Sequence, residues 1–171
     1  MGDFTGSSTT NIALQALILV VVAIAVVTDV RRRRIYNLLT FPAMALGLVV
    51  NTVVDGGSGL LLALIGLLLG GALFFIPVAV MGRGAGDLKL LAAVGALGGP
   101  IFVLWCALFT TIAGGVFAVG VLLARRRLLS VTAGMALDLY TGQAPRANSK
   151  ISLPYAVPIT VGAVAALVLR W

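Results

Sequence analysis

The stretch Gly84-Ala85-Gly86-Asp87-Leu88-Lys89 opens an apolar run that carries no further charge until Arg125. As one straight helix, residues 87–124 would be about 55 Å long, because an α-helix rises about 1.5 Å per residue. That length is far greater than the roughly 30 Å hydrocarbon core of a membrane. Proline lacks an N–H and glycine tolerates unusual backbone angles, so the helix is expected to break and fold back at Gly98-Gly99-Pro100.

The composition indicates a protein that is almost entirely embedded in a membrane. Hydrophobic residues make up 61% of the chain and charged residues 10%, with a mean hydropathy of +1.16; a soluble domain carries roughly 25% charged residues. The net charge of +7 would also suit nucleic acid, but the basic residues gather in short loops between apolar runs, which is typical of membrane topology. The sequence therefore predicts one all-α, polytopic domain over residues 1–171, with membrane lipid as a partner and no bound nucleic acid.

Six apolar runs predict about six transmembrane helices. They lie at residues 12–28, 37–54, 59–80, 87–99, 101–124 and 154–170. The loops after the first, third and fifth runs, with Lys89 at the start of the fourth, hold eleven of the twelve Lys and Arg residues. The positive-inside rule makes that side cytoplasmic. Both termini are then expected outside, and Asp29 and Asp87 are expected together at the cytoplasmic face.

Few residue types are available for chemistry. The chain has five Asp, no Glu and no His, and its only cysteine, Cys106, lies within an apolar run. These counts argue against a disulfide, a zinc site and a cysteine or serine nucleophile with a histidine base, and we expect no metal and no cofactor. Asp29 and Asp87 remain, each at a membrane boundary where a carboxylate is costly. In such a pair, one carboxyl group is ionised and acts as base on water, and the other is protonated and donates its proton to the substrate carbonyl.

Backbone direction suggests how the two aspartates divide these roles. Asp29 is expected at the C-terminal end of its helix, where the dipole disfavours negative charge, and Asp87 at the N-terminal end of its own, where the dipole favours it. This favours Asp87 as the base and Asp29 as the protonated partner. Arg31-Arg32-Arg33-Arg34 act in the opposite direction by stabilising a charged Asp29, so the sequence leaves the assignment open.

The glycines before Asp87 have two interpretations of about equal weight. Gly84 and Gly86 can adopt positive φ and allow close backbone approach, which would let an extended substrate peptide lie beside Asp87. The alternative is an ordinary glycine turn into a helix that has Asp87 as its N-cap.

Three further residues are supporting candidates for the site. Lys89 is expected either to snorkel to the interface or to tune the carboxylate pair. Asn37 is expected to start a helix or to hydrogen-bond near Asp29. Tyr155 is expected to pack over the site or to anchor at the membrane interface.

Three blocks of the sequence resemble type IV prepilin peptidases, the G-x-G-D aspartyl proteases of the membrane, in the short form associated with tight-adherence (Flp-type) pili. They are Asp29-Val30-Arg31-Arg32-Arg33-Arg34-Ile35-Tyr36-Asn37-Leu38-Leu39-Thr40, Gly84-Ala85-Gly86-Asp87-Leu88-Lys89-Leu90-Leu91-Ala92 and Leu153-Pro154-Tyr155-Ala156-Val157-Pro158-Ile159. The second block is the most specific, and in the first Tyr36 stands where the family usually has Pro.

The resemblance implies that Asp29 and Asp87 are the catalytic pair of an aspartic endopeptidase in the cytoplasmic (inner) membrane. Its substrate would be a type IV prepilin, cut after a Gly at the cytoplasmic face, between a short basic leader and the apolar pilin helix. Longer family members also carry a cysteine-bearing cytoplasmic loop and methylate the new N-terminus. This chain has neither that loop nor room for a methyltransferase domain, so we expect no methyltransferase activity.

Two other classes of function are alternatives. A small transporter or ion-conducting protein could use the two Asp residues as a cation or proton site, although transport favours acids at the bilayer midplane rather than at one face. A non-catalytic membrane subunit would tolerate substitution of both.

Overall fold

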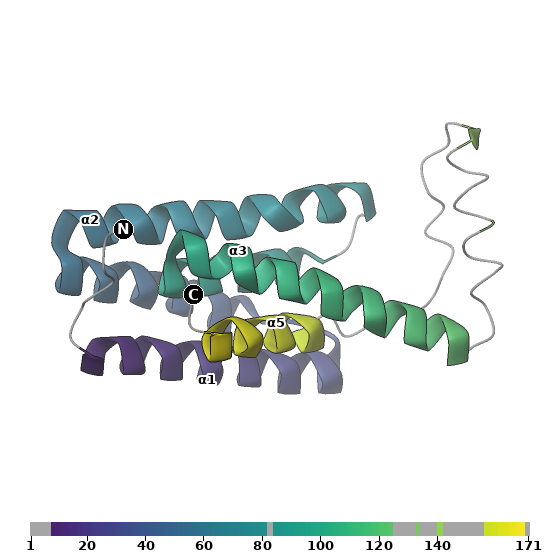
Figure 1. The fold of residues 1–171 in the computed structure, drawn as a ribbon, viewed down its shortest axis with the longest axis horizontal. Helices are drawn as coiled ribbons and strands as arrows, with labels where there is room; N and C mark the ends of the chain where they lie inside the picture. The colour runs from purple at the N-terminus through teal and green to yellow at the C-terminus, as the bar shows by residue number, and fades with distance from the viewer. Residues whose placement is uncertain (1–7, 82–83, 125–132, 134–139, 142–155, 170–171) are drawn as a thin grey trace.

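The computed structural model describes residues 8–81, 84–124, 133, 140–141 and 156–169. Within these ranges the chain is helical and contains no strand. The helices are α1 (Ser8–Arg32), α2 (Asn37–Met81), α3 (Ala85–Ala124) and α5 (Ala156–Leu169), and Figure 1 shows them side by side in one elongated bundle. The all-α fold predicted from the sequence is confirmed for this part of the chain.

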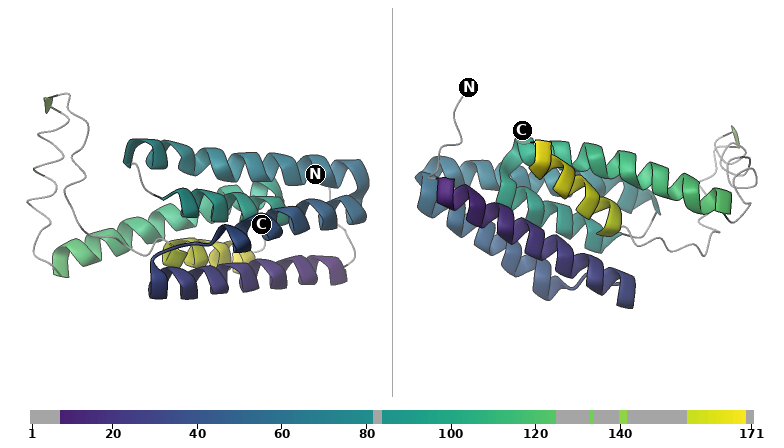
Figure 2. Two further views of the ribbon diagram at one scale, coloured as in Figure 1. Left: turned by 180° about the vertical axis from the view of Figure 1, so that it is seen from behind. Right: turned by 60° about the horizontal axis from the view of Figure 1, so that its bottom comes forward.

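The two longest helices are each interrupted at one glycine. Gly56 has φ 61° and ψ −138° within α2, and Gly99 has φ 79° and ψ −178° within α3. Positive φ is costly for a residue with a Cβ, so glycine suits both positions. The break predicted at Gly98-Gly99-Pro100 is confirmed. Figures 1 and 2 show the chain folding back at both breaks, so that each helix forms two neighbouring arms.

The first arm of α3 lies at the centre of the bundle, because small residues allow α2 to approach it closely. Leu90 to Leu97 are all buried. An added Cβ at Gly66 would overlap the carbonyl oxygen of Gly95, and one at Gly47 would lie 2.7 Å from the carbonyl carbon of Ala96. Close backbone contact of this kind is typical of helix packing in membranes.

A single asparagine supports the break in α3. Pro100 cannot donate the N–H that would normally reach the carbonyl of Ala96. Asn51 on α2 replaces it: its Nδ2 donates to the carbonyl oxygens of Ala96 at 3.1 Å and Leu97 at 3.4 Å, and to Gly47 within its own helix at 2.8 Å. Backbone carbonyls buried away from water need such partners.

Helix α5 lies against both α1 and α3 and provides the largest share of the packing of α1 on the bundle. It packs against both α3 and α1, and α1 contacts α5 more extensively than it contacts α2 or α3. At Gly162, an added Cβ would overlap the side-chain oxygen of Thr110 on α3, so the absence of a side chain lets α5 lie directly against α3. The position of Asp29, near the end of α1, therefore depends on α5.

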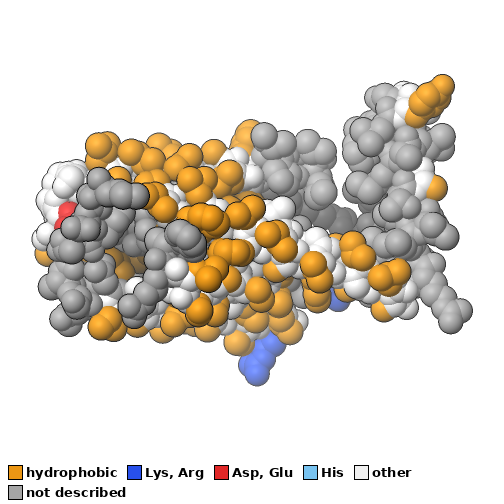
Figure 3. All heavy atoms as spheres, viewed as in Figure 1, with side chains coloured by type: hydrophobic (Ala, Val, Ile, Leu, Met, Phe, Trp, Pro, Cys, Tyr) orange, Lys and Arg blue, Asp and Glu red, His pale blue; other side chains and the backbone are white. Residues whose placement is uncertain are grey.

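The outer surface is apolar, as expected for a protein in contact with lipid. Figure 3 shows hydrophobic side chains over most of the described part of one face, and α1, α2 and α3 are each long and apolar enough to cross a membrane. The chain is therefore a membrane protein. The number of crossings stays a prediction, as does the location of the termini, since residues 1–7 and 170–171 lie outside the described ranges.

Candidate active site

Asp29 lies in the last turn of α1 and is only 8% exposed. The helix ends just after it: the N–H of Arg33 donates to the carbonyl oxygen of Asp29 at 2.7 Å, and Arg33 takes a positive φ of 51°. This is the αL ending that glycine usually provides. The side chain of Asp29 faces inward, where its Oδ2 accepts a hydrogen bond of 3.1 Å from the backbone N–H of Ala156, the first residue of α5.

Asp87 lies in the first turn of α3 and is half-buried. Gly84, just before this helix, has φ 97°, and its carbonyl oxygen accepts a hydrogen bond from the N–H of Leu88 at 3.1 Å. Gly84 therefore needs the backbone freedom that the sequence suggested. Gly86 is not at a positive φ, contrary to that part of the expectation.

Gly86 instead permits a close contact within the chain. A Cβ added at Gly86 would lie 3.0 Å from Cβ of Ile35, in the connection between α1 and α2. The missing side chain lets the start of α3 approach the residues that follow α1. Asp29 lies six residues before Ile35, and Asp87 directly follows Gly86. The contact between Ile35 and Gly86 therefore brings the two aspartates toward each other.

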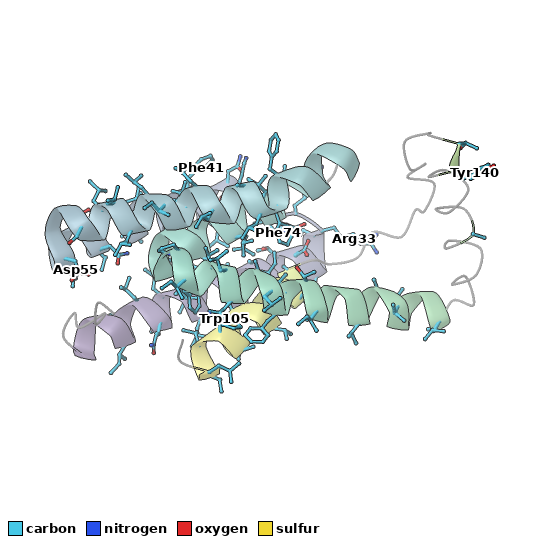
Figure 4. All side chains as sticks on the ribbon, turned by 45° about the horizontal axis from the view of Figure 1, so that its top comes forward. Arg33, Phe41, Asp55, Phe74, Trp105 and Tyr140 are labelled. Atoms are coloured by element: carbon cyan, nitrogen blue, oxygen red, sulfur yellow. The ribbon has the colours of Figure 1, made fainter. Side chains whose placement is uncertain are left out.

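The structure places the carboxyl groups of Asp29 and Asp87 close enough to interact electrostatically. One belongs to the C-terminal end of α1 and the other to the N-terminal end of α3, 58 positions apart in sequence. Asp55, next to the break in α2, is exposed, and Figure 4 shows it at the opposite end of the bundle from Arg33. Of the three aspartates that the structure describes, two therefore lie near each other at one end of the bundle.

Lys89 and Asn37, both predicted as supporting residues, contact each other. Lys89 Nζ donates to Asn37 Oδ1 at 2.9 Å and lies 5.4 Å from the centre of the Phe41 ring. Asn37 is the first residue of α2, and the carbonyl of the preceding Tyr36 accepts the first helical hydrogen bonds. The Asn37 side chain thus binds α3 rather than capping its own helix, and Lys89 ties the starts of α2 and α3 together.

Tyr155, the third supporting residue, lies outside the described residues. The residue after it, Ala156, was not a candidate in the sequence, yet its N–H is the described partner of Asp29. The sequence does not mark which backbone N–H will act as a donor, because almost every residue has one. The only indication was that the third resembling block, residues 153–159, includes Ala156.

The remaining chemical groups point to acid–base chemistry. Cys106, on α3, is fully buried, with its Sγ 4.0 Å from Thr110 Oγ1 of the same helix. Within the described ranges, no group of three or more His, Cys, Asp or Glu residues could hold a metal ion. Two neighbouring carboxyl groups can share one proton, and they can both activate water and protonate a carbonyl.

Two carboxyl groups that interact electrostatically at one end of an apolar helix bundle are the groups that acid–base hydrolysis in a membrane needs. The sequence profile of the type IV leader peptidase family matches residues 16–119, which include both aspartates and most of α1, α2 and α3. The chain belongs to this family, and its general role is that of a type IV leader peptidase. No curated protein and no solved structure matches the chain significantly.

Proposed function

We propose that the protein is an aspartic endopeptidase that removes the short basic leader from type IV, Flp-like prepilins, with Asp29 and Asp87 as its catalytic pair. One observation carries the proposal: in a chain of the leader peptidase family, these two carboxyl groups lie close enough to interact electrostatically at one end of an apolar helix bundle. The prepilin substrate follows from the family, and the Flp-like subtype rests on the resemblance of the short form.

Two carboxyl groups are sufficient for peptide hydrolysis. The ionised one removes a proton from water while the water oxygen bonds to the carbonyl carbon of the substrate. The protonated one gives its proton to the carbonyl oxygen, and a tetrahedral diol forms. The pair then works in reverse: one carboxyl protonates the leaving nitrogen as the C–N bond breaks, and the other takes a proton from the diol.

The charges near the pair support a site at the cytoplasmic face of the cell (inner) membrane. Arg31, Arg32, Arg33 and Arg34 are all exposed at the end of α1, within five residues of Asp29. Cytoplasmic loops carry an excess of such residues. A prepilin would then present its leader to the cytoplasm and its apolar helix to the lipid, with the scissile bond between them at the level of the pair.

Gly84 is proposed to contact the substrate backbone. It is only partly buried and stands three residues before Asp87, so an extended peptide could approach the main chain there without meeting a side chain. Gly86 is less suited to this role, because the space beside it is occupied by Ile35. Transport is not favoured as an alternative, since the two acids lie at one end of the bundle.

The proposal is tested by co-expressing a leader-bearing pilin with the wild-type protein, Asp29→Asn, Asp87→Asn and, as a matched control, Asp55→Asn at the opposite end. We expect cleavage by wild type and Asp55→Asn, and none by the other two. Unaltered cleavage by either would remove that aspartate from the mechanism. Failure of the wild type against several leaders would overturn the proposed substrate class.

A further inference from the structure

The first backbone N–H of α5 is the one described hydrogen-bond donor to a carboxylate of the pair. Ala156 is fully buried, and its N–H points at Asp29 Oδ2 across 3.1 Å. The family match ends at residue 119, so both aspartates lie inside the matched region while this donor lies 37 residues beyond it. The matched region alone does not contain all the groups that contact the pair.

We propose that the first turn of α5 belongs to the active site, where the Ala156 N–H holds Asp29 in the ionised form that activates water and leaves the shared proton on Asp87. This assignment rests on the proposed peptidase function. It also reverses the role assignment that helix direction alone favoured in the sequence.

The physical reason is the difference between a direct hydrogen bond and a helix dipole. A backbone N–H that donates to a carboxylate stabilises its charged form. The dipole of α1 opposes charge on Asp29 and that of α3 favours charge on Asp87, but a helix dipole usually contributes less than a direct hydrogen bond to a charged group. Asp29 also lies at the N-terminus of α5, whose dipole adds to the hydrogen bond.

The start of α5 has few alternative donors. Pro158 lacks an N–H, so Ala156 and Val157 provide the only backbone donors among the first three residues of the helix. Helix α5 packs against both α1 and α3, so it places one amide beside Asp29 while its body rests on the helix that carries Asp87.

Of the other charged groups near Asp29, Arg31, Arg33 and Arg34 are exposed at the end of α1. Arg32 donates to the Tyr36 hydroxyl, and Lys89 of α3 donates to Asn37. Residues 156–169 of α5 contain no ionisable side chain. From outside α1, the described charged group that interacts with Asp29 is Asp87 of α3, so the Ala156 N–H and Asp87 are the two influences to separate.

In the hydrolytic step, the water O–H bond breaks and its proton passes to Asp29 as the new C–O bond forms. The Asp87 proton moves to the carbonyl oxygen at the same time. When the C–N bond breaks, Asp29 returns its proton to the leaving nitrogen and Asp87 recovers one from a diol hydroxyl. Both groups regain their starting states, and one water is consumed for each peptide bond cut.

The first test removes only this N–H, by replacing Ala156 with lactic acid so that the backbone amide becomes an ester. The same change at Val157 is the matched control. We expect the acidic limb of the kcat/KM–pH profile to move to higher pH by about one unit, since loss of a hydrogen bond to a charged group is of that order. The KM of the Ala156 ester should change little, and the pH profile of the Val157 ester should stay close to that of wild type.

A second measurement needs neither cleavage nor a substitution at Ala156. Tyr155-Ala156 is the only Tyr-Ala pair in the chain, so labelling Tyr with ¹³C and Ala with ¹⁵N gives one selective NMR signal for this amide. Its proton shift should titrate with pH in wild type and in Asp87→Asn, and should be insensitive to pH in Asp29→Asn. These signals are independent of whether pilin is the substrate.

The two proposals can therefore fail separately. The role of α5 would be overturned if the amide signal titrated in the same way in Asp29→Asn as in wild type. It would also be overturned if the acidic limb of the pH profile did not move in the Ala156 ester, or moved equally in the Val157 ester. A titrating amide in a protein that cleaves none of the leaders tested would preserve the hydrogen bond and overturn the proposed substrate class.

Discussion

Replacing Asn51 with leucine tests whether the break in α3 depends on a partner from α2. Asn51 Nδ2 donates across the helix interface to the carbonyls of Ala96 and Leu97. Leucine has a similar size but no donor. The variant therefore leaves two carbonyls without this donor in the interior of the bundle, where Ala96 and Leu97 are at most 1% exposed.

The expected loss of stability follows from these contacts. Hydrogen bonds between membrane helices average about 0.6 kcal/mol and reach about 1.7 kcal/mol. A buried carbonyl left unsatisfied costs about 1–3 kcal/mol. The bond to Ala96 has good length and the 3.4 Å bond to Leu97 is near the limit, so we expect the free energy of unfolding to fall by about 2 kcal/mol.

Thr52→Val is the matched control for this substitution. Thr52 is the next residue on the same helix, but its hydroxyl donates only to the Leu48 carbonyl, within its own helix, at 2.6 Å. We expect its effect to stay below about 0.5 kcal/mol. Both variants would be compared with wild type by steric trapping in lipid bicelles. An Asn51→Leu effect no larger than that of Thr52→Val would refute the reasoning.

The described contacts give three further predictions, each with a control substitution. Gly95→Ala should lower stability by about 1–3 kcal/mol, because its Cβ would overlap a backbone carbonyl of α2. Gly115→Ala, with open space around it, should raise stability by about 0.5–1 kcal/mol. Equal unfolding curves for the two variants would contradict the packing argument. Arg33→Gly should relieve the positive φ of 51° and raise stability by about 0.5–1 kcal/mol, whereas Arg33→Lys should not, as thermal unfolding in detergent would show. Lys89→Met should lose the contacts with Asn37 and Phe41 and about 1 kcal/mol of stability, and Lys89→Arg should lose less. A larger loss of stability for Lys89→Arg in the same unfolding assay would exclude the role of Lys89 in joining α2 and α3.

Local chemistry made parts of the fold predictable from sequence. The break at Gly98-Gly99-Pro100 follows from a missing N–H and a tolerant backbone, both properties of the residues themselves. The convergence of Asp29 and Asp87 was predictable because charge placement assigns both to the same side of the membrane. The positive φ at Gly84 was also expected from residue type.

The contacts that could not be predicted involve partners far apart in sequence. Asn51 reaches carbonyls 45 and 46 positions away, and a lone asparagine in an apolar run does not reveal its partner. The Asp29 donor is a backbone N–H 127 positions away, and every residue except proline has one. Gly86 was expected to admit a substrate, but the space beside it is filled by Ile35, a contact that only tertiary packing creates.

The central claim is that Asp29 and Asp87 act as one catalytic unit, and a double-mutant cycle with purified protein tests it most directly. The measurement is kcat/KM for a leader-bearing pilin peptide with wild type, Asp29→Asn, Asp87→Asn and the double variant, each checked for an unchanged unfolding temperature. The account predicts that each single substitution lowers kcat/KM by at least about 10²-fold, and that the double variant is no slower than the worse single one, since residues that act together are not additive. Single variants that retain near-normal rates, or losses that multiply in the double variant, would contradict it.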